Sequence, residues 1–164
     1  MFYTTSIMRQ KPLWRFIDND ATFVADNPQR VSSLYFPLAN EAEMMSSVTP
    51  ELKGDIKTDN NSFLMMPVSR ADLLYVQSSR NFWIRSNKGI WSVADDAQAN
   101  TSLQAGLLYH ALIKTNKKLG LKATITNFIP VNSAHVELML VDITNISNSP
   151  LEITTTSAIP IYGR

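Results

Sequence analysis

Cysteine is absent from the 164 residues, and this absence removes several classes of chemistry at once. Without thiols the chain has no disulfide, no thiolate zinc site and no cysteine nucleophile. Glycine is also scarce, and its five residues form no glycine-rich phosphate loop. No apolar run approaches the roughly 20 residues that span a bilayer. The first residues, MFYTTSIMRQKPLW, lack the basic and apolar regions of a secretory signal. We therefore expect a cytoplasmic protein with no membrane partner.

Neither sign of charge dominates, because fifteen basic and fourteen acidic side chains give a net charge of +1. A protein so balanced has no field strong enough to gather nucleic acid or an anionic membrane surface. Hydrophobic residues make up 45% of the chain and charged residues 18%, which is typical of a folded globular protein. Since this length suffices to bury one hydrophobic core, we expect a single domain over residues 1–164 with no nucleic-acid partner.

Groups that could bind a metal or perform catalysis are sparse. His110 and His135 have no ligand-type residue at close spacing, so no metal site is expected. Glycoside cleavage needs an acid across the scissile bond and a carboxylate, water or phosphate opposite it. The candidate carboxylate pairs are Glu41 and Glu43, Asp95 and Asp96, and Asp18 and Asp20. Adjacent aspartates are typical of solvated loops, and only the glutamates are kept as candidates for ligand contact. No credible acid, base or nucleophile constellation is present.

Apolar and polar residues alternate along most of the chain, with turn residues between the runs, which favours β-strands. Residues 13–26 are expected to form a hairpin around the turn at 18–20. Four longer strands are predicted at 103–115, 120–131, 135–146 and 150–162. The first of these would also suit a helix, although its alternation and its neighbours favour a strand. The expected fold class is all-β, an antiparallel β-sandwich with at most short helical turns.

The remaining segments are expected to be strand ends and loops. Pro37 and Pro67 lie in short apolar runs at 33–39 and 62–68, and proline fits a sheet edge because it cannot donate to the ladder. Long loops are predicted at 39–61 and 93–102, and one short helical turn at 70–78.

Four lysines surround one predicted turn near the C-terminus. Lysines at the end of a hairpin are normally solvent-exposed and discourage pairing of sheet edges. We expect that role for them rather than a phosphate or nucleic-acid site. The residues are Lys114, Lys117, Lys118 and Lys122.

The stretch SRNFWIRSNKGIWS, residues 79–92, is the most distinctive hairpin. Gly89 suits a left-handed position in a three-residue turn. Strand alternation puts Phe82 and Ile84 on one face and Trp83 and Arg85 on the other. Aromatic faces stack on apolar sugar surfaces and arginine donates to hydroxyls, so these types suit a sugar site. They suit core packing equally well, and Trp91 beside the turn is more typical of a core anchor.

This hairpin resembles one in the N-terminal domain of cellobiose-phosphorylase-like enzymes, glycoside hydrolase family 94 or its relative, family 161. Three further stretches carry the resemblance: FIDNDATFVADNPQR (16–30), YFPLANEAEMMSSVTPELKGDIKT (35–58) and LKATITNFIPVNSAHVELMLVDITNISNSPLEI (121–153). The second is the most specific of the three. This sequence departs from the family pattern at Ala21 and Glu43, where glycine is expected.

The resemblance implies an inverting phosphorylase that splits a β-glucosidic bond with inorganic phosphate. Such enzymes have a large N-terminal β-sandwich, followed by a linker and an (α/α)6 barrel with the general-acid aspartate and the phosphate site. No part of that barrel is present in this sequence. The resemblance therefore implies a non-catalytic N-terminal fragment that needs no cofactor, supports the barrel and contacts carbohydrate. A cut sheet would leave an open edge, so we expect a homodimer.

An independent carbohydrate-binding module is the alternative function, and a small enzyme in its own right is disfavoured. Under either sugar-related function, six side chains are candidates for carbohydrate contact. They are Arg80, Trp83, Arg85, Trp91, Asn40 and Glu41.

Overall fold

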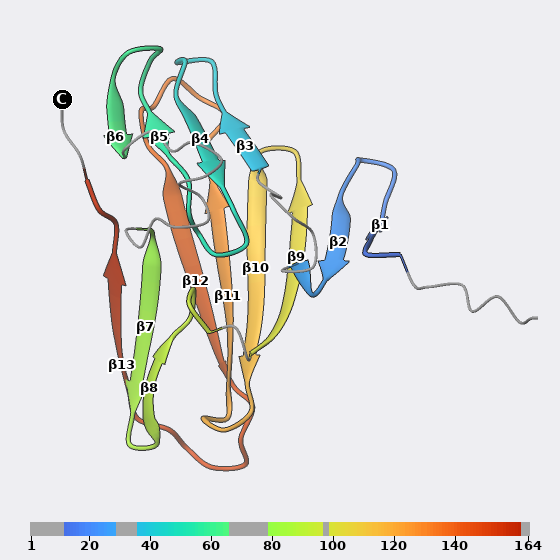
Figure 1. The fold of residues 1–164 in the computed structure, drawn as a ribbon, viewed down its shortest axis with the longest axis vertical. Helices are drawn as coiled ribbons and strands as arrows, with labels where there is room; N and C mark the ends of the chain where they lie inside the picture. The colour runs from blue at the N-terminus through green and yellow to red at the C-terminus, as the bar shows by residue number, and fades with distance from the viewer. Residues whose placement is uncertain (1–11, 29–35, 66–78, 97–98, 162–164) are drawn as a thin grey trace, which may run out of the picture.

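The computed structural model describes residues 12–28, 36–65, 79–96 and 99–161, which form β-strands and connecting loops without an α-helix (Figure 1). This confirms the all-β fold class. In chain order the strands are β1 (Trp14–Phe16), β2 (Phe23–Asp26), β3 (Phe36–Ala39), β4 (Met45–Val48), β5 (Ile56–Lys57), β6 (Phe63–Met65), β7 (Asn81–Ser86), β8 (Gly89–Ser92), β9 (Asn100–Gly106), β10 (Tyr109–Asn116), β11 (Leu121–Phe128), β12 (Leu138–Asn145) and β13 (Ile153–Ala158).

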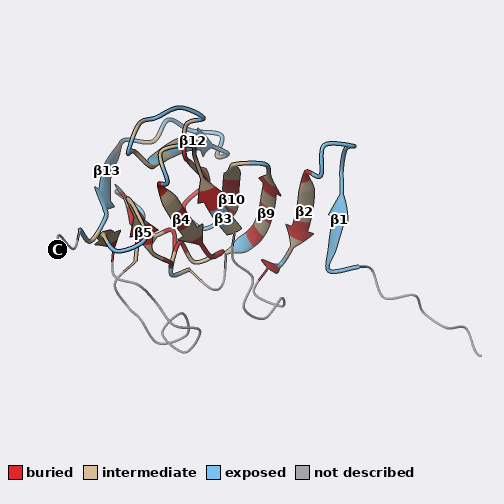
Figure 2. Cartoon of the chain, turned by 90° about the horizontal axis from the view of Figure 1, so that it is seen from above, coloured by how far each residue is buried: buried red, intermediate tan, exposed pale blue. Residues whose placement is uncertain are grey.

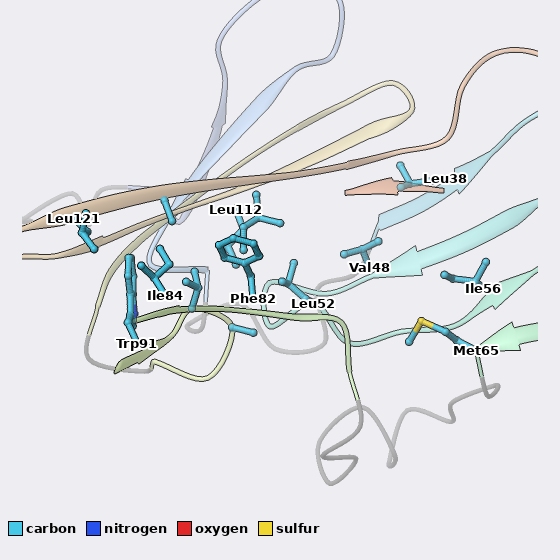
Figure 3. Close-up of a cluster of buried hydrophobic side chains, with 14 of the residues drawn as sticks. Leu38, Val48, Leu52, Ile56, Met65, Phe82, Ile84, Trp91, Leu112 and Leu121 are labelled. Carbon is cyan, nitrogen blue, oxygen red and sulfur yellow. The ribbon is translucent and has the colours of Figure 1, made fainter. Parts of the chain in front are cut away.

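The strands form three antiparallel sheets arranged as a sandwich. The large sheet has the order β1-β2-β9-β10-β11-β12, and the two smaller sheets have the orders β13-β7-β8 and β3-β4-β5-β6. Apolar side chains of the three sheets join in one core, which includes Leu112 from the large sheet and Ile84 and Val48 from the smaller ones (Figure 3). The two smaller sheets together therefore cover the inner face of β10, β11 and β12.

Strand alternation explains how the large sheet contributes to this core. Along β11, every second residue from Leu121 to Asn127 is buried, while the residues between them are partly exposed. The pattern has the period of two that a half-buried strand requires. The predicted strands at 120–131, 135–146 and 150–162 correspond to β11, β12 and β13 and are confirmed.

One end of the large sheet extends beyond the smaller sheets. Figure 2 shows β1 exposed along its whole length, in agreement with the exposed fractions of Trp14 and Phe16. The rings of these two residues meet edge-on with centroids 5.2 Å apart, and Trp14 also meets Phe23 edge-on at 6.2 Å. The predicted hairpin at 13–26 is confirmed, because β1 pairs antiparallel with β2.

The prediction of one continuous strand or helix at 103–115 is wrong. These residues belong to two strands, because β9 ends at Gly106 and β10 begins at Tyr109. Leu107 is 81% exposed at the turn and Leu108 has a φ of 63°. Two leucines thus occupy positions where turns usually carry glycine, asparagine or proline, so residue type gave no turn signal.

Other boundaries also differ from expectation. The predicted loop at 39–61 contains β4 and β5, and residues 100–102 of the predicted loop at 93–102 belong to β9. β3 and β6 lie within the short apolar runs, and Pro37 is in β3 at the end of its sheet, as proline requires. Pro67 and the helical turn predicted at 70–78 lie outside the described residues.

Two non-glycine residues have left-handed backbone where the family resemblance led us to expect glycine. Ala21 and Glu43 each have a φ of 61°. The Asp18 carboxylate fixes the turn that holds Ala21, because its Oδ1 accepts hydrogen bonds from the amides of Asp20 and Thr22 at 2.9 and 3.0 Å. A hydrogen bond with the side chain of Thr22 is the largest cause of the lowered pKa of Asp18, and the two backbone amides lower it further. This turn therefore imposes a conformation that an alanine adopts only at some cost.

We predict that Ala21→Gly stabilises the protein. A left-handed L-residue costs about 1–2 kcal/mol, and the greater unfolded-state freedom of glycine offsets about 0.5–1 kcal/mol of that cost. The expected net gain is about 0.5–1 kcal/mol in the free energy of unfolding, measured by urea denaturation. Ala158→Gly, at an exposed position of β13, is the control and is expected to destabilise. Equal losses in both variants would contradict the prediction.

Candidate functional site

The sheet formed by β13, β7 and β8 has one face toward the core and one toward solvent (Figure 1). On the central strand β7, Phe82 and Ile84 are buried in the core. Trp83 is partly exposed and Arg85 exposed, on the other side of the strand. The alternation predicted for this hairpin is therefore confirmed. The three-residue turn is not, because Ser86 pairs with Gly89 and only Asn87 and Lys88 lie between the strands. Gly89 has a positive φ, 137°, but it is the first residue of β8. We call the solvent side of this sheet the outer face.

The register places small polar groups and one apolar side chain around Trp83 and Arg85. Trp83 pairs with Thr156 of β13 on one side and Ser92 of β8 on the other. Arg85 pairs in the same way with Thr154 and with Ile90, which is 72% exposed. The outer face therefore offers an aromatic and aliphatic surface beside a guanidinium. Such a surface can contact both the apolar side and the hydroxyls of a sugar.

The loop after β8 is held by a polar network at the edge of the outer face. Asn81 Nδ2 donates to Ser92 Oγ at 2.9 Å and to Asp95 Oδ2 at 2.8 Å, while the Ser92 hydroxyl donates to the same carboxylate oxygen at 2.6 Å. Asp96 instead accepts from the Ala99 amide at 3.1 Å. The two adjacent aspartates thus belong to separate networks that shape the loop.

Arg80 and Trp91, two of the six candidates for carbohydrate contact, lie inside the protein. Arg80 is 0% exposed. Its Nε lies 2.6 Å from Glu137 Oε1, and its second terminal nitrogen donates to Glu137 Oε2 at 2.8 Å and to Ser46 Oγ at 2.9 Å. Trp91 is buried in the core cluster. Both side chains are therefore enclosed by the protein and have no exposed surface that a ligand could contact.

Asn40 and Glu41 join two loops. Asn40 Nδ2 donates to the Ala134 carbonyl at 2.8 Å, and its Oδ1 accepts from the Ala42 amide at 3.0 Å. Glu41 is exposed and accepts from the Ser133 hydroxyl at 3.2 Å. Of the six candidates, the structure brings Trp83 and Arg85 together on one surface.

The lysine prediction is wrong for Lys114, which is only 2% exposed. Its Nζ donates to the carbonyls of Ala94 and Asp96 at 2.8 and 3.1 Å, and burial lowers its pKa. Lys114 follows the alternation of β10 inward, so its position in the strand outweighs its charge. Lys117 and Lys118 are exposed, as predicted, and Lys122 is partly exposed.

His110 is the least expected polar group in the core. It is 0% exposed, the Phe36 ring lies 5.2 Å from its own, and neither ring nitrogen has a hydrogen-bond partner. Its cross-strand neighbour Asn127 is also buried, and the Oδ1 of that residue is likewise without a partner. Burial lowers the pKa of His110 to about 3. The imidazole is therefore neutral at physiological pH.

His135 and Glu137 show what sequence reasoning placed incorrectly or missed. His135 lies before β12 and not within a strand, and the Ala42 carbonyl lies 3.1 Å from its Nε2. Glu137 was not singled out, because the arginine it binds is 57 residues away and no local pattern joins them. In the ranges that the structure describes, no three histidine or acidic side chains gather as metal ligands. No described segment forms a helix long and apolar enough to cross a membrane.

No protein-family model matches the chain, and a search of curated proteins finds no match.

We predict that His110 makes the stability of the protein depend on pH. Its pKa is about 3 in the folded state against 6.5 for an unperturbed histidine. The unfolded state therefore binds the extra proton first, and stability that is fully present above pH 6.5 is lost as the pH falls toward 3. The slope is about 1.4 kcal/mol per pH unit, or about 2 kcal/mol between pH 6.5 and 5.

His110→Leu removes this titration and two unsatisfied buried nitrogens, so it is expected to be neutral or stabilising at pH 7. Urea denaturation at pH 7 and pH 5 measures both effects. The assignment would be wrong if His110→Leu lost as much stability as the wild type between the two pH values.

Proposed function

We propose that this chain is a non-catalytic β-sandwich domain that supports an inverting glycoside phosphorylase acting on β-glucosides. In that arrangement the general acid and the phosphate site lie in a helical barrel, and inorganic phosphate is a substrate of the whole enzyme. The sandwich would brace the barrel, form dimer contacts and contribute carbohydrate contacts. The proposal starts from the resemblance carried by residues 16–30, 35–58, 79–92 and 121–153.

The observation that carries this proposal is the backbone at Ala21 and Glu43. Both have a φ of 61°, a conformation that only a few per cent of non-glycine residues adopt. These are the two positions where the resemblance implies glycine. The agreement supports a backbone path of the phosphorylase type in two separate parts of the chain.

The contacts of three described carboxylates favour a supporting role over a catalytic one for these groups. Glu137 pairs with Arg80 inside the sandwich, Asp95 holds the loop after β8, and Asp18 accepts backbone hydrogen bonds in its turn. A general acid must be free to transfer its proton to the reacting bond. These three groups are instead engaged in holding the fold.

A second candidate function is an independent carbohydrate-binding module. The observation that favours it is the outer face, where Trp83 and Arg85 project from one strand with the exposed Ile90 beside them. This function needs no catalytic partner and is compatible with the same sandwich.

Two measurements test the phosphorylase proposal. The purified chain, supplied with cellobiose and inorganic phosphate, is expected to form no glucose 1-phosphate, because the barrel would perform the chemistry. Sequencing downstream of the codon for Arg164 is expected to reveal a helical region of several hundred residues in the same frame. Glucose 1-phosphate formed by the purified chain would contradict the proposal, as would a downstream frame without such a region.

We further infer that two copies of the chain associate through β12. In the part of the chain that the structure describes, β12 pairs with β11 alone and ends the large sheet. Leu138 and Leu140 are exposed on this strand, 41% and 54%. Asp142 is its one charged residue, so an antiparallel pair of β12 strands related by a two-fold axis can avoid facing like charges. Long apolar edges of this kind favour pairing with another strand.

Sedimentation velocity at increasing protein concentration tests this inference, and a concentration-dependent dimer is expected. Leu140→Lys should shift the equilibrium toward monomer, because lysine discourages edge pairing. Leu107→Lys makes the same change at the exposed β9–β10 turn and should leave association unchanged. A wild-type protein that stays monomeric at all concentrations would refute the inference.

A further inference from the structure

A cleft of about 240 Å³ lies where the outer face meets the β7–β8 turn. Its lining side chains are Arg85, Ser86, Asn87, Glu152 and Thr154. Arg85 and Thr154 are paired neighbours on β7 and β13, and Asn87 belongs to the turn. Glu152 comes from the segment just before β13, which Figure 1 shows beside that turn. Two regions far apart in the sequence thus build one site.

The charged groups of this cleft remain available to a ligand. Arg85 and Glu152 are both exposed, and neither side chain makes a hydrogen bond or ion pair with another described residue. Ser86 Oγ accepts from the Lys88 amide at 3.2 Å, which leaves its own hydroxyl proton free to donate. The cleft therefore presents donors on Arg85, Asn87 and Ser86 and an ionisable acceptor on Glu152.

The balance of charge selects the class of ligand. A phosphate or sugar phosphate would be attracted by Arg85 but repelled by Glu152. A cation would be attracted by Glu152 but repelled by Arg85. A neutral diol satisfies both groups, because one hydroxyl donates to the carboxylate while its neighbour accepts from the guanidinium. The opposite charges in the cleft thus favour an uncharged sugar.

The size of the cleft and its surroundings limit how much sugar it can hold. Its volume lies below the roughly 300–1,000 Å³ of pockets for drug-sized ligands, which fits one sugar ring and not a longer chain. Trp83 lies two residues from Arg85 on the same side of β7. A second sugar ring bonded to the first could therefore lie against the indole face.

The geometry points to a binding site for a neutral glycoside of two or more rings, with one ring in the cleft between Arg85 and Glu152 and the next on Trp83. This inference rests on the second candidate function, sugar contact by the outer face. It adds the groups that would form hydrogen bonds with the sugar hydroxyls, including Glu152, which the sequence did not single out.

Titration of the full chain with cellobiose, laminaribiose and sophorose, followed by backbone and indole NMR shifts, tests the site. At least one of these disaccharides is expected to shift the amides of Asn87 and Thr154 together with the indole of Trp83. Glu152→Gln and Arg85→Gln are each expected to weaken binding about tenfold, because each removes a charge-assisted hydrogen bond. Trp83→Ala should weaken binding by a similar factor.

Matched controls separate the site from general effects of substitution. Asp142→Asn removes an exposed carboxylate from β12, and Trp14→Ala removes an exposed indole from β1, so neither should change the affinity for the disaccharides. Inorganic phosphate and glucose 1-phosphate are titrated in parallel. Each is expected to bind more weakly than the best disaccharide.

Three outcomes would overturn the inference, and they can be told apart. Sugar binding that depends on Trp83 but not on Arg85 or Glu152 would keep the second candidate function and refute the cleft. Tighter binding of phosphate, strengthened by Glu152→Gln, would make the cleft an anion site. No shift with any disaccharide at millimolar concentration would refute both the cleft and the second candidate function, and would leave the phosphorylase proposal untouched.

Discussion

A single buried guanidinium joins all three sheets of this protein. Arg80 immediately precedes β7 in the three-stranded sheet, and it bonds to Ser46 of β4 in the four-stranded sheet. Its carboxylate partner, Glu137, immediately precedes β12 in the large sheet and also accepts from Asn127 of β11 at 3.2 Å. Removing one member of a buried ion pair leaves the other charge uncompensated, at a cost of about 3–5 kcal/mol. The relative placement of the sheets is therefore tied to this pair.

This constraint also determines which face of the hairpin meets solvent. Because Arg80 is fixed inside the sandwich just before β7, the strand starts in a defined register against β13 and β8. Phe82 and Ile84 then enter the core, and Trp83 and Arg85 must point outward. The chemistry available on the outer face thus follows from an ion pair on the other side of the same strand.

The sequence predicts those features that depend on near neighbours. The period of two identified the later strands and the two faces of β7, and turn residues identified the hairpins at 13–26 and 81–92. It missed the β9–β10 turn, because leucines occupy its two central positions. The prediction for Lys114 failed for a related reason. A lysine is expected at the solvent-exposed surface, but the carbonyls of Ala94 and Asp96 accept hydrogen bonds from its buried ammonium group.

The candidate site was predictable to a similar extent. Trp83 and Arg85 follow from alternation along one strand, so local pattern placed them correctly. The position of Glu152 does not follow from such alternation. This residue lies far beyond Arg85 in the chain and reaches the cleft only because β13 pairs with β7. Arg80 and Trp91 have the residue types of a sugar site, but both side chains are buried, Arg80 just before β7 and Trp91 within β8. Pairing between distant strands is what local sequence patterns cannot specify.

The polar groups of the interior differ in role from those of the surface site. Arg80 and Glu137 form a buried ion pair, and Lys114 donates to backbone carbonyls, so these buried charges have partners inside the sandwich. Buried polar groups that are fully paired rigidify a fold, and those that are not paired weaken it. His110 and the Oδ1 of Asn127 belong to the second kind. Arg85 and Glu152, in contrast, are exposed and retain their hydrogen-bonding capacity, so recognition by this domain is expected where they meet.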